Sequence, residues 1–229
     1  MQSKIFASII ISFLLMTSIW AQEPPSWIPL GDIPWGYGIY DILEIPGSNI
    51  ILVCGTGFAN RGIWKTTNGG QSWSEVLNVG SAVSRFERDS VSGRIWTYPG
   101  GRSGANTLYF TTDNGQTWTG VSSPPSNFAV SVNWIEVVGN YLYYGGSITN
   151  PYSICLYRLH QDSLVWEMVT QYPQCNSITT LKFHNNKLVV FAKDKVQNFL
   201  RIFSYTPAQL DEKAKFLGKA ETSEASKEK

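Results

Sequence analysis

This sequence has few residues that could bind a metal and no motif typical of a cofactor site. Its basic and acidic residues are nearly equal in number. Its 229 residues include three cysteines and two histidines, and the formal net charge is +1. No Cys-x-x-Cys pair occurs, and His160 and His184 stand far from any ligand spacing, so we expect no structural metal and no cofactor. A balanced charge does not favour a nucleic acid or an anionic membrane as partner.

Long hydrophobic runs are also absent, apart from one at the N-terminus. Lys4 precedes the apolar run 5–16, and Ser18-Ile19-Trp20-Ala21 offers a cleavage site, which is the pattern of a signal peptide over residues 1–21. The run is too short for a comfortable membrane span, and no later stretch could cross a membrane. We therefore expect a secreted or periplasmic protein that does not span a membrane.

The cysteine count is odd, which leaves at least one thiol outside any disulfide. Cys155 and Cys175 lie 20 positions apart and could pair in an exported chain. Cys54 stands within an apolar run and is expected to be a buried thiol.

Composition divides the chain after the leader. Residues 22–210 are rich in aromatic residues and short β-type runs, enough for one core. Residues 211–229 carry five acids and five bases, with Phe216 and Leu217 as the large apolar residues. This composition predicts a charged, solvated and disordered tail that adds nothing to stability.

An octet occurs twice, 45 positions apart, as Thr-Thr-[Asn/Asp]-x-Gly-Gln-[Ser/Thr]-Trp. Apolar and aromatic residues precede each copy, which predicts a strand, a tight turn and a second strand. The third residue has a side-chain oxygen that can accept from turn N–H groups, the Gly suits a positive φ, and the Trp can anchor the turn below. The residues that carry this pattern are Thr66, Asn68, Gly70, Ser72, Trp73, Thr111, Asp113, Gly115, Thr117 and Trp118.

The octet resembles the Asp-box (BNR repeat) of sialidases, photosystem assembly factors and sortilin-like receptors. In that group the box forms the hairpin between the third and fourth strands of a β-propeller blade. The second copy matches every motif position, whereas the first has Asn68 for Asp and Ser72 for Thr. The resemblance covers roughly residues 26–205 and implies a fold more than a function, because propellers host unrelated activities.

The repeat extends through the body, which predicts an all-β propeller of about four four-stranded antiparallel blades. The fourth set lacks a fourth strand, and Ser26–Leu30, which resembles an outer strand, is predicted to supply it. The alternative is an incomplete six- or seven-bladed propeller. The expected strands are Ile39–Ile45, Ile50–Thr56, Gly62–Thr67, Ser72–Val79, Val83–Arg88, Arg94–Tyr98, Thr107–Thr112, Thr117–Val121, Val130–Val138, Tyr141–Gly146, Ile154–Leu159, Leu164–Thr170, Ile178–His184, Lys187–Ala192 and Phe199–Tyr205.

Catalytic residues cannot be assigned. The Arg-Ile-Pro motif of sialidases is missing, since Arg94-Ile95 and Arg201-Ile202 are followed by aromatic residues. Asp41, Glu44 and Asp89 are expected to be ordinary strand or strand-end carboxylates.

The loops opposite the octets offer candidates for ligand binding. Aromatic residues beside amides and guanidinium groups suit a sugar or a peptide, and the alternative for each Asn, which we favour, is a turn former with left-handed geometry. The candidates are Phe58, Asn60, Arg61, Tyr98, Arg102, Asn106, Asn150 and Tyr152.

We therefore expect an exported, monomeric, non-catalytic module that binds or assembles a protein or glycan. One alternative is a glycoside hydrolase of sialidase or xyloglucanase type, intact or truncated. The other is an inactive propeller fragment.

Overall fold

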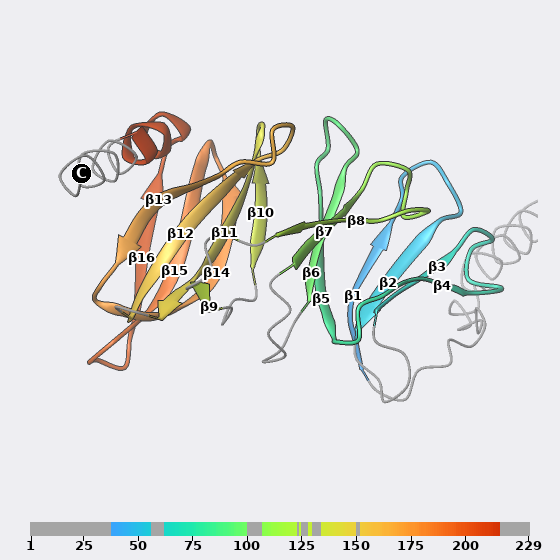
Figure 1. The fold of residues 1–229 in the computed structure, drawn as a ribbon, viewed down its shortest axis with the longest axis horizontal. Coiled ribbons are helices and arrows are strands. Elements are labelled where there is room, and N and C mark those ends of the chain that lie inside the picture. The colour runs from blue at the N-terminus through green and yellow to red at the C-terminus, as the bar shows by residue number, and fades with distance from the viewer. Residues whose placement is uncertain are drawn as a thin grey trace, which may run out of the picture. The chain divides into compact units, whose positions relative to one another are not determined.

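The computed structural model describes residues 38–55, 62–99, 107–122, 124, 128–129, 134–149 and 152–215 (Figure 1). The expected signal peptide and the expected closing strand Ser26–Leu30 lie outside these residues. Within them the fold is all-β with blade-like antiparallel sheets, as the repeat predicts. No helix in the described parts of the chain is long and apolar enough to cross a membrane.

In the described residues, sixteen strands form four sheets in chain order. Sheet A has the order β1-β2-β3-β4 and sheet B the order β5-β6-β7-β8. Sheet C has the order β10-β11-β12-β13 with β9 beside β11, and sheet D has the order β14-β15-β16. The bounds are β1 Ile39–Glu44, β2 Ile51–Gly55, β3 Gly62–Thr66, β4 Ser74–Asn78, β5 Val83–Arg88, β6 Ile95–Pro99, β7 Thr107–Thr111, β8 Thr119–Ser122, β9 Phe128–Ala129, β10 Ile135–Val138, β11 Tyr141–Thr149, β12 Tyr152–His160, β13 Trp166–Tyr172, β14 Cys175–His184, β15 Lys187–Asp194 and β16 Leu200–Tyr205.

In each sheet the turn between the first and second strands contains a residue with a positive φ. Gly47 at φ 74° turns β1 into β2, and Gly139 at φ 56° turns β10 into β11. Asn185 and Asn186, at φ 48° and 58°, form the predicted two-residue turn between β14 and β15. Such turns match the right-handed twist of the strands they join.

The core consists of layers between consecutive sheets rather than one central cluster. Neighbouring sheets contact one another through their first strands, with β5 against β1, β10 against β5, and β14 against β10. Cluster A–B contains Ile45, Leu52, Cys54, Ile63, Val83, Phe86 and Ile95. Cluster B–C contains Trp96, Tyr98, Leu108, Val121, Ile135, Leu142, Tyr144, Cys155, Tyr157 and Leu159. Cluster C–D contains Val138, Tyr143, Ile154, Leu156, Val169, Tyr172, Cys175, Ile178, Leu181, Leu188, Val190, Ala192 and Leu210.

The second octet is a turn held by its own side chains. Thr111 Oγ1 donates to Asp113 Oδ1 at 2.6 Å and accepts from the Gly115 N–H at 3.0 Å. The Thr117 N–H donates to Asp113 Oδ1 at 2.9 Å, and Thr117 Oγ1 donates to Asp113 Oδ2 at 2.6 Å. Trp118 then packs against cluster A–B, so the hairpin of sheet B reaches the preceding sheet.

The first octet has a similar pattern of hydrogen bonds. Thr66 Oγ1 donates to Asn68 Oδ1 at 2.8 Å and accepts from the Gly70 N–H at 2.9 Å. The Ser72 N–H donates to Asn68 Oδ1 at 3.0 Å. Trp73 Nε1 donates to the Gly70 carbonyl at 3.0 Å, so this ring closes over its own turn.

The third hairpin, between β12 and β13, lacks the octet and uses Gln161 instead. The side chain of Gln161 accepts from Trp96 Nε1 at 2.9 Å and donates to the Gly139 carbonyl at 3.0 Å. It also lies 3.3 Å from Asp89 Oδ2. A single buried amide therefore ties sheet C to sheet B. Trp166, which follows this turn, donates from Nε1 to the Ser122 carbonyl of β8 at 2.8 Å.

Two expectations about the chain need correction. The charged segment 211–229 is not a solvated tail from its start, because residues 207–215 form a helix in which Leu210 and Ala214 are buried. No disulfide joins Cys155 and Cys175. Both thiols are buried, and they belong to different layers, B–C and C–D.

Candidate functional site

Most of the predicted ligand-binding loops fall outside the described residues. That is the case for Phe58, Asn60, Arg61, Arg102, Asn106 and Asn150. Tyr152 is described by its backbone alone, as the first residue of β12 paired with Thr149. These six side chains and that of Tyr152 stay predictions.

Tyr98 is a core residue and not a ligand platform. Its side chain is 1% exposed, and its ring meets that of Tyr144 edge-on with 6.1 Å between centroids. Burial, followed by the nearby Tyr144 hydroxyl, raises the pKa of Tyr98 well above its usual value. The prediction failed because Tyr98 stands on the face of β6 that packs in cluster B–C.

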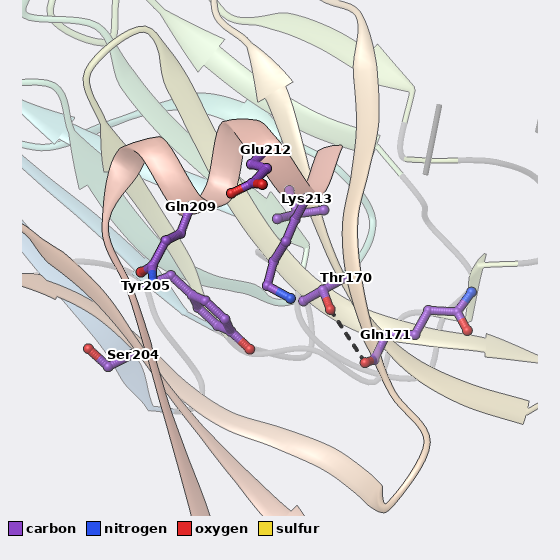
Figure 2. A pocket seen from close by; sticks show the side chains of 8 residues that line it. Thr170, Gln171, Ser204, Tyr205, Gln209, Glu212 and Lys213 are labelled. Carbon is purple, nitrogen blue, oxygen red and sulfur yellow. Dashed lines mark hydrogen bonds between the residues drawn. The ribbon is translucent and has the colours of Figure 1, made fainter. Parts of the chain in front are cut away.

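A cavity of about 650 Å³ lies between β13, β16 and the helix 207–215 (Figure 2). Figure 2 shows the Tyr205 ring and the Lys213 ammonium directed into the same space beside Thr170. The Lys213 Nζ lies 5.4 Å from the centre of the Tyr205 ring. The lining residues are Val169, Thr170, Gln171, Ser204, Tyr205, Gln209, Glu212 and Lys213.

The helix that forms one wall begins with a capping box. The Thr206 N–H donates to Gln209 Oε1 at 2.9 Å, and the Gln209 N–H donates to Thr206 Oγ1 at 3.4 Å. Pro207 occupies the first helical position, where its missing N–H costs nothing. Gln209, Glu212 and Lys213 recur at spacings of three and four, so they share the face that lines the cavity.

Two contacts hold this helix against the sheets. Leu210 is fully buried in cluster C–D. Asp211 forms an ion pair with Arg158 of β12, whose guanidinium is also 2.7 Å from Glu167 and stacks 4.0 Å over Tyr141. The cavity wall is thus anchored by an apolar side chain and by a paired, buried cation.

Sequence reasoning missed this site although a signal for it was present. Thr206-Pro207-Ala208-Gln209 is a helix start, and Leu210 and Ala214 recur four apart. The high charge of the residues from 211 onward hid this helix, because that composition predicts a disordered tail.

Carboxylates on the first strands link neighbouring sheets. Asp41 Oδ2 accepts from the Phe86 N–H at 2.8 Å, and Glu136 Oε1 accepts from the Phe183 N–H at 2.7 Å. Glu87 accepts from the Val137 N–H in the same manner. Sheets A, B and C therefore each present one carboxylate to the backbone of the next sheet, a repeat that the sequence did not reveal.

Glu87 and Glu136 are close enough to affect one another. Burial, followed by the negative charge of Glu136, raises the pKa of Glu87 to about 7, while Lys182, the Val137 N–H and Arg85 act in the opposite direction. Glu136 is itself bound by Lys182 Nζ at 3.0 Å and by the Phe183 N–H. One member of this pair is consequently fixed by two donors.

Asp89 is likewise engaged by local donors. Its Oδ1 accepts from the Val91 N–H at 2.9 Å and its Oδ2 from the Ser92 hydroxyl at 2.6 Å. Glu44 is exposed at the end of β1. Among the described residues, no three His, Cys, Asp or Glu side chains gather as a metal site would require.

Comparison with known proteins assigns no family to this chain. No family profile and no curated protein matches the chain. A luciferin-regenerating enzyme is similar in structure, with a TM-score of 0.47 and 16% identity over 75% of this chain and 59% of that one. The GH74 enzyme of Niastella koreensis has a TM-score of 0.46 and 24% identity over 69% of this chain and 26% of that one. The chain thus spans less than two thirds of either structure.

Proposed function

We propose that this chain is an exported Asp-box β-propeller that works as a non-catalytic module for binding or assembling a protein or a glycan. The observation that carries the proposal is the cavity beneath the helix. Its described lining combines the phenol ring of Tyr205 with two aliphatic hydroxyls, two amides, an ammonium group and a carboxylate. Such groups bind by stacking and hydrogen bonding.

The chemistry of the lining favours binding over catalysis. Among the described residues that line it, Glu212 is the one carboxylate, and no histidine or cysteine accompanies it. Glycoside hydrolysis ordinarily uses two carboxylates on either side of a scissile bond. The cavity therefore suits recognition of a ligand that leaves unchanged.

The hydrogen bonds within both octets support the assignment of these turns as Asp-boxes. In each copy a Thr hydroxyl and a carboxyl or amide oxygen accept the turn N–H groups. This is the hydrogen bonding expected of a structural fastener, so we assign these residues to stability and not to ligand contact. Export rests on the leader pattern of residues 1–21.

A glycoside hydrolase is the second candidate, and one observation favours it. Glu87 and Glu136 form a coupled carboxylate pair in which Glu87 has a raised pKa of about 7, as a general acid needs. Against it, both groups accept N–H bonds from the next sheet, as Asp41 does. We assign the pair to joining sheets.

The test is binding by the full chain to a glycan array and a displayed peptide library, with each hit then titrated. Tyr205→Ala should raise the dissociation constant of the hit at least tenfold. Tyr40→Ala, a matched exposed tyrosine on β1, should leave it unchanged. If both variants bind the ligand equally well, the cavity is not the binding site.

The same ligands serve to test for catalysis. Oligosaccharides incubated with the chain should be recovered intact by chromatography. Cleavage that disappears in Glu87→Gln would replace the binding module by the hydrolase.

A further inference from the structure

Lys213 extends into the cavity without a carboxylate partner. Its Nζ lies 5.4 Å from the centre of the Tyr205 ring. Arg94, Arg158 and Arg201 also lie over aromatic rings, and each of them forms an ion pair with a carboxylate as well. In the described parts of the chain, no carboxylate forms an ion pair with Lys213. Its positive charge and its three N–H donors are therefore available to a ligand.

The ring of Tyr205 orients the Lys213 ammonium without neutralising it. A cation near an aromatic ring is attracted by the ring electrons but keeps its charge. Lys213 is half-buried, whereas its neighbour Glu212 is exposed. In Figure 2 the Glu212 carboxylate lies on the Gln209 side of the helix, and Lys213 extends toward Thr170. The part of the cavity between Tyr205 and Thr170 is consequently positive.

Gln209 adds a second donor to the same wall. Its Oε1 accepts from the Thr206 N–H at 2.9 Å and from the Thr206 hydroxyl at 3.2 Å. These bonds fix the orientation of the amide and leave its NH₂ group as a donor for the cavity. Gln209 and Lys213 lie four positions apart, so they share one face of the helix. A charged and a neutral donor side by side suit the oxygens of an anionic group.

The rest of the described lining suits a ligand with many hydroxyl groups. Thr170, Ser204, Gln171 and Glu212 offer hydroxyl, amide and carboxylate groups that exchange hydrogen bonds with such a ligand. Val169 is the one aliphatic residue among them, and its side chain is fully buried. The wall therefore lacks the apolar pockets that select the side chains of a bound peptide. Its volume of about 650 Å³ is typical of sites for small ligands.

We propose that the cavity binds an acidic saccharide and that Lys213 binds its carboxylate or sulfate group. The ammonium of Lys213 and the amide of Gln209 donate to the anionic oxygens. Tyr205 is the positioning residue for Lys213, and the polar groups of β13 and β16 bind the sugar hydroxyls. This inference rests on the proposed binding function and selects an acidic glycan as the ligand of the cavity.

The test compares an acidic saccharide with its neutral ester. Tetragalacturonate and its fully methyl-esterified form are each titrated with the full chain by isothermal calorimetry, and a sulfated neocarratetraose distinguishes sulfate from carboxylate. We expect saturable binding of an acidic tetrasaccharide. The ester should bind roughly tenfold or more weakly than the galacturonate, as the loss of a charge-assisted hydrogen bond implies. Equal binding of acid and ester without a tighter sulfated ligand, or no binding of either acid, would overturn the proposal.

Lys213→Gln should lower the affinity for the acid roughly tenfold or more and leave that for the ester unchanged. The unchanged ester binding excludes a folding defect in this variant. Lys215→Gln, at an exposed position of the same helix, should change neither affinity. Lys213→Arg keeps the charge and should retain the preference for the acid. If Lys213→Arg loses that preference as fully as Lys213→Gln, the role of Lys213 is packing and the proposal fails.

Two substitutions of Tyr205 separate its ring from its hydroxyl. Tyr205→Phe keeps the ring that orients Lys213 and should keep the preference for the acid over the ester. Tyr205→Ala removes the ring and should lose that preference. Equal loss in both variants would show that the ring does not position the ammonium.

Other ligands would give different results. A neutral glycan or a peptide whose binding depends on Tyr205 but not on Lys213 would leave the proposed function standing without this inference. If tetraglutamate binds in a manner that depends on Lys213 and neither acidic saccharide does, the ligand is an acidic peptide and the inference fails. If no glycan or peptide binds in a manner that depends on Tyr205, the inference and the proposed role of the cavity fail together.

Discussion

Gly115, in the turn of the second octet, lies directly on Leu52 of the neighbouring sheet. A Cβ atom at position 115 would fall 2.8 Å from Leu52 Cδ2, and Leu52 is fully buried. The next residue, Gln116, accepts from Lys65 Nζ at 3.3 Å. The octet is thus more than a local turn, because its tip also joins sheet B to sheet A.

Gly115→Ala should destabilise the protein more than another left-handed glycine does. Gly115 has φ 77°, so alanine adds backbone strain to the contact with Leu52. We expect a loss of roughly 2–4 kcal/mol in the free energy of unfolding, from strain and overpacking together. Gly69→Ala, at φ 68° with open space around it, should lose about 1 kcal/mol. Urea melts of both variants measure this, and equal losses would show that the contact is unimportant.

Asp113→Ala should remove the acceptor at the centre of the second octet. Burial acts to raise its pKa, but hydrogen bonds from Thr111 and Thr117 lower the pKa of Asp113 well below its usual range. The stability it contributes is therefore complete above the unfolded pKa of 3.8 and is lost as the pH falls through the lower, folded value.

We expect Asp113→Ala to cost on the order of 1–2 kcal/mol at pH 7. Asp113→Asn, which copies Asn68 of the first octet, should cost less. Melting curves of the parent and both variants at pH 7 and pH 3 would test this, and a cost in Asp113→Ala that is no smaller at pH 3 would contradict it.

The repeat was predictable because its signals are local. The two octets, the Asn185-Asn186 turn and the alternating strands each depend on side chains within a few residues of one another. The order of four sheets follows once the 45-residue spacing is seen. The predicted strand bounds differ from the observed ones by a few residues, and β9 is a strand that the periodicity did not indicate.

The site was not predictable in the same way, because it depends on contacts between distant residues. Tyr98 is an aromatic residue of the kind that stacks on ligands. Its ring is nevertheless buried against that of Tyr144, 46 positions later in the chain. The helix forms in spite of its polar sequence because Arg158, some 50 positions earlier in the chain, pairs with Asp211. Gln161 replaces a lost octet by reaching Trp96. Contacts between residues so far apart in the chain produce no local pattern that a single sequence would reveal.

Leu210→Ala should destabilise the protein, in contrast to the sequence-based expectation that the charged segment adds nothing. Its fully buried side chain belongs to cluster C–D, and such truncations cost roughly 2–5 kcal/mol. Lys215→Ala, at an exposed position of the same helix, should change the melting temperature little. Equal melting of the two variants would mean that the helix does not dock.

Deleting residues 211–229 should also be destabilising, because it removes the partner of a buried cation. Arg158 would keep Glu167 but lose Asp211, and the buried Ala214 would be removed with its contacts. We expect a loss of roughly 2–4 kcal/mol, because a buried cation loses one of its two carboxylate partners. A deletion variant that melts like the parent would restore the view of this segment as a tail.

Glu87→Gln should make the protein more stable at alkaline pH. Burial and the charge of Glu136 raise the pKa of Glu87 from 4.5 to about 7, so the folded state prefers the protonated carboxyl. The stability from Glu87 is then complete below pH 4.5 and is lost as the pH rises through 7. Glutamine keeps a carbonyl acceptor for the Val137 N–H and has no charge to develop beside Glu136. We expect the parent to lose on the order of 2 kcal/mol between pH 5 and pH 8 that Glu87→Gln retains. Thermal melts across this range measure the difference, with Glu44→Gln, at an exposed position on β1, as the control that should follow the parent. If Glu87→Gln declines with pH as steeply as Glu44→Gln, the two first-strand carboxylates are not coupled and Glu87 is an ordinary acid.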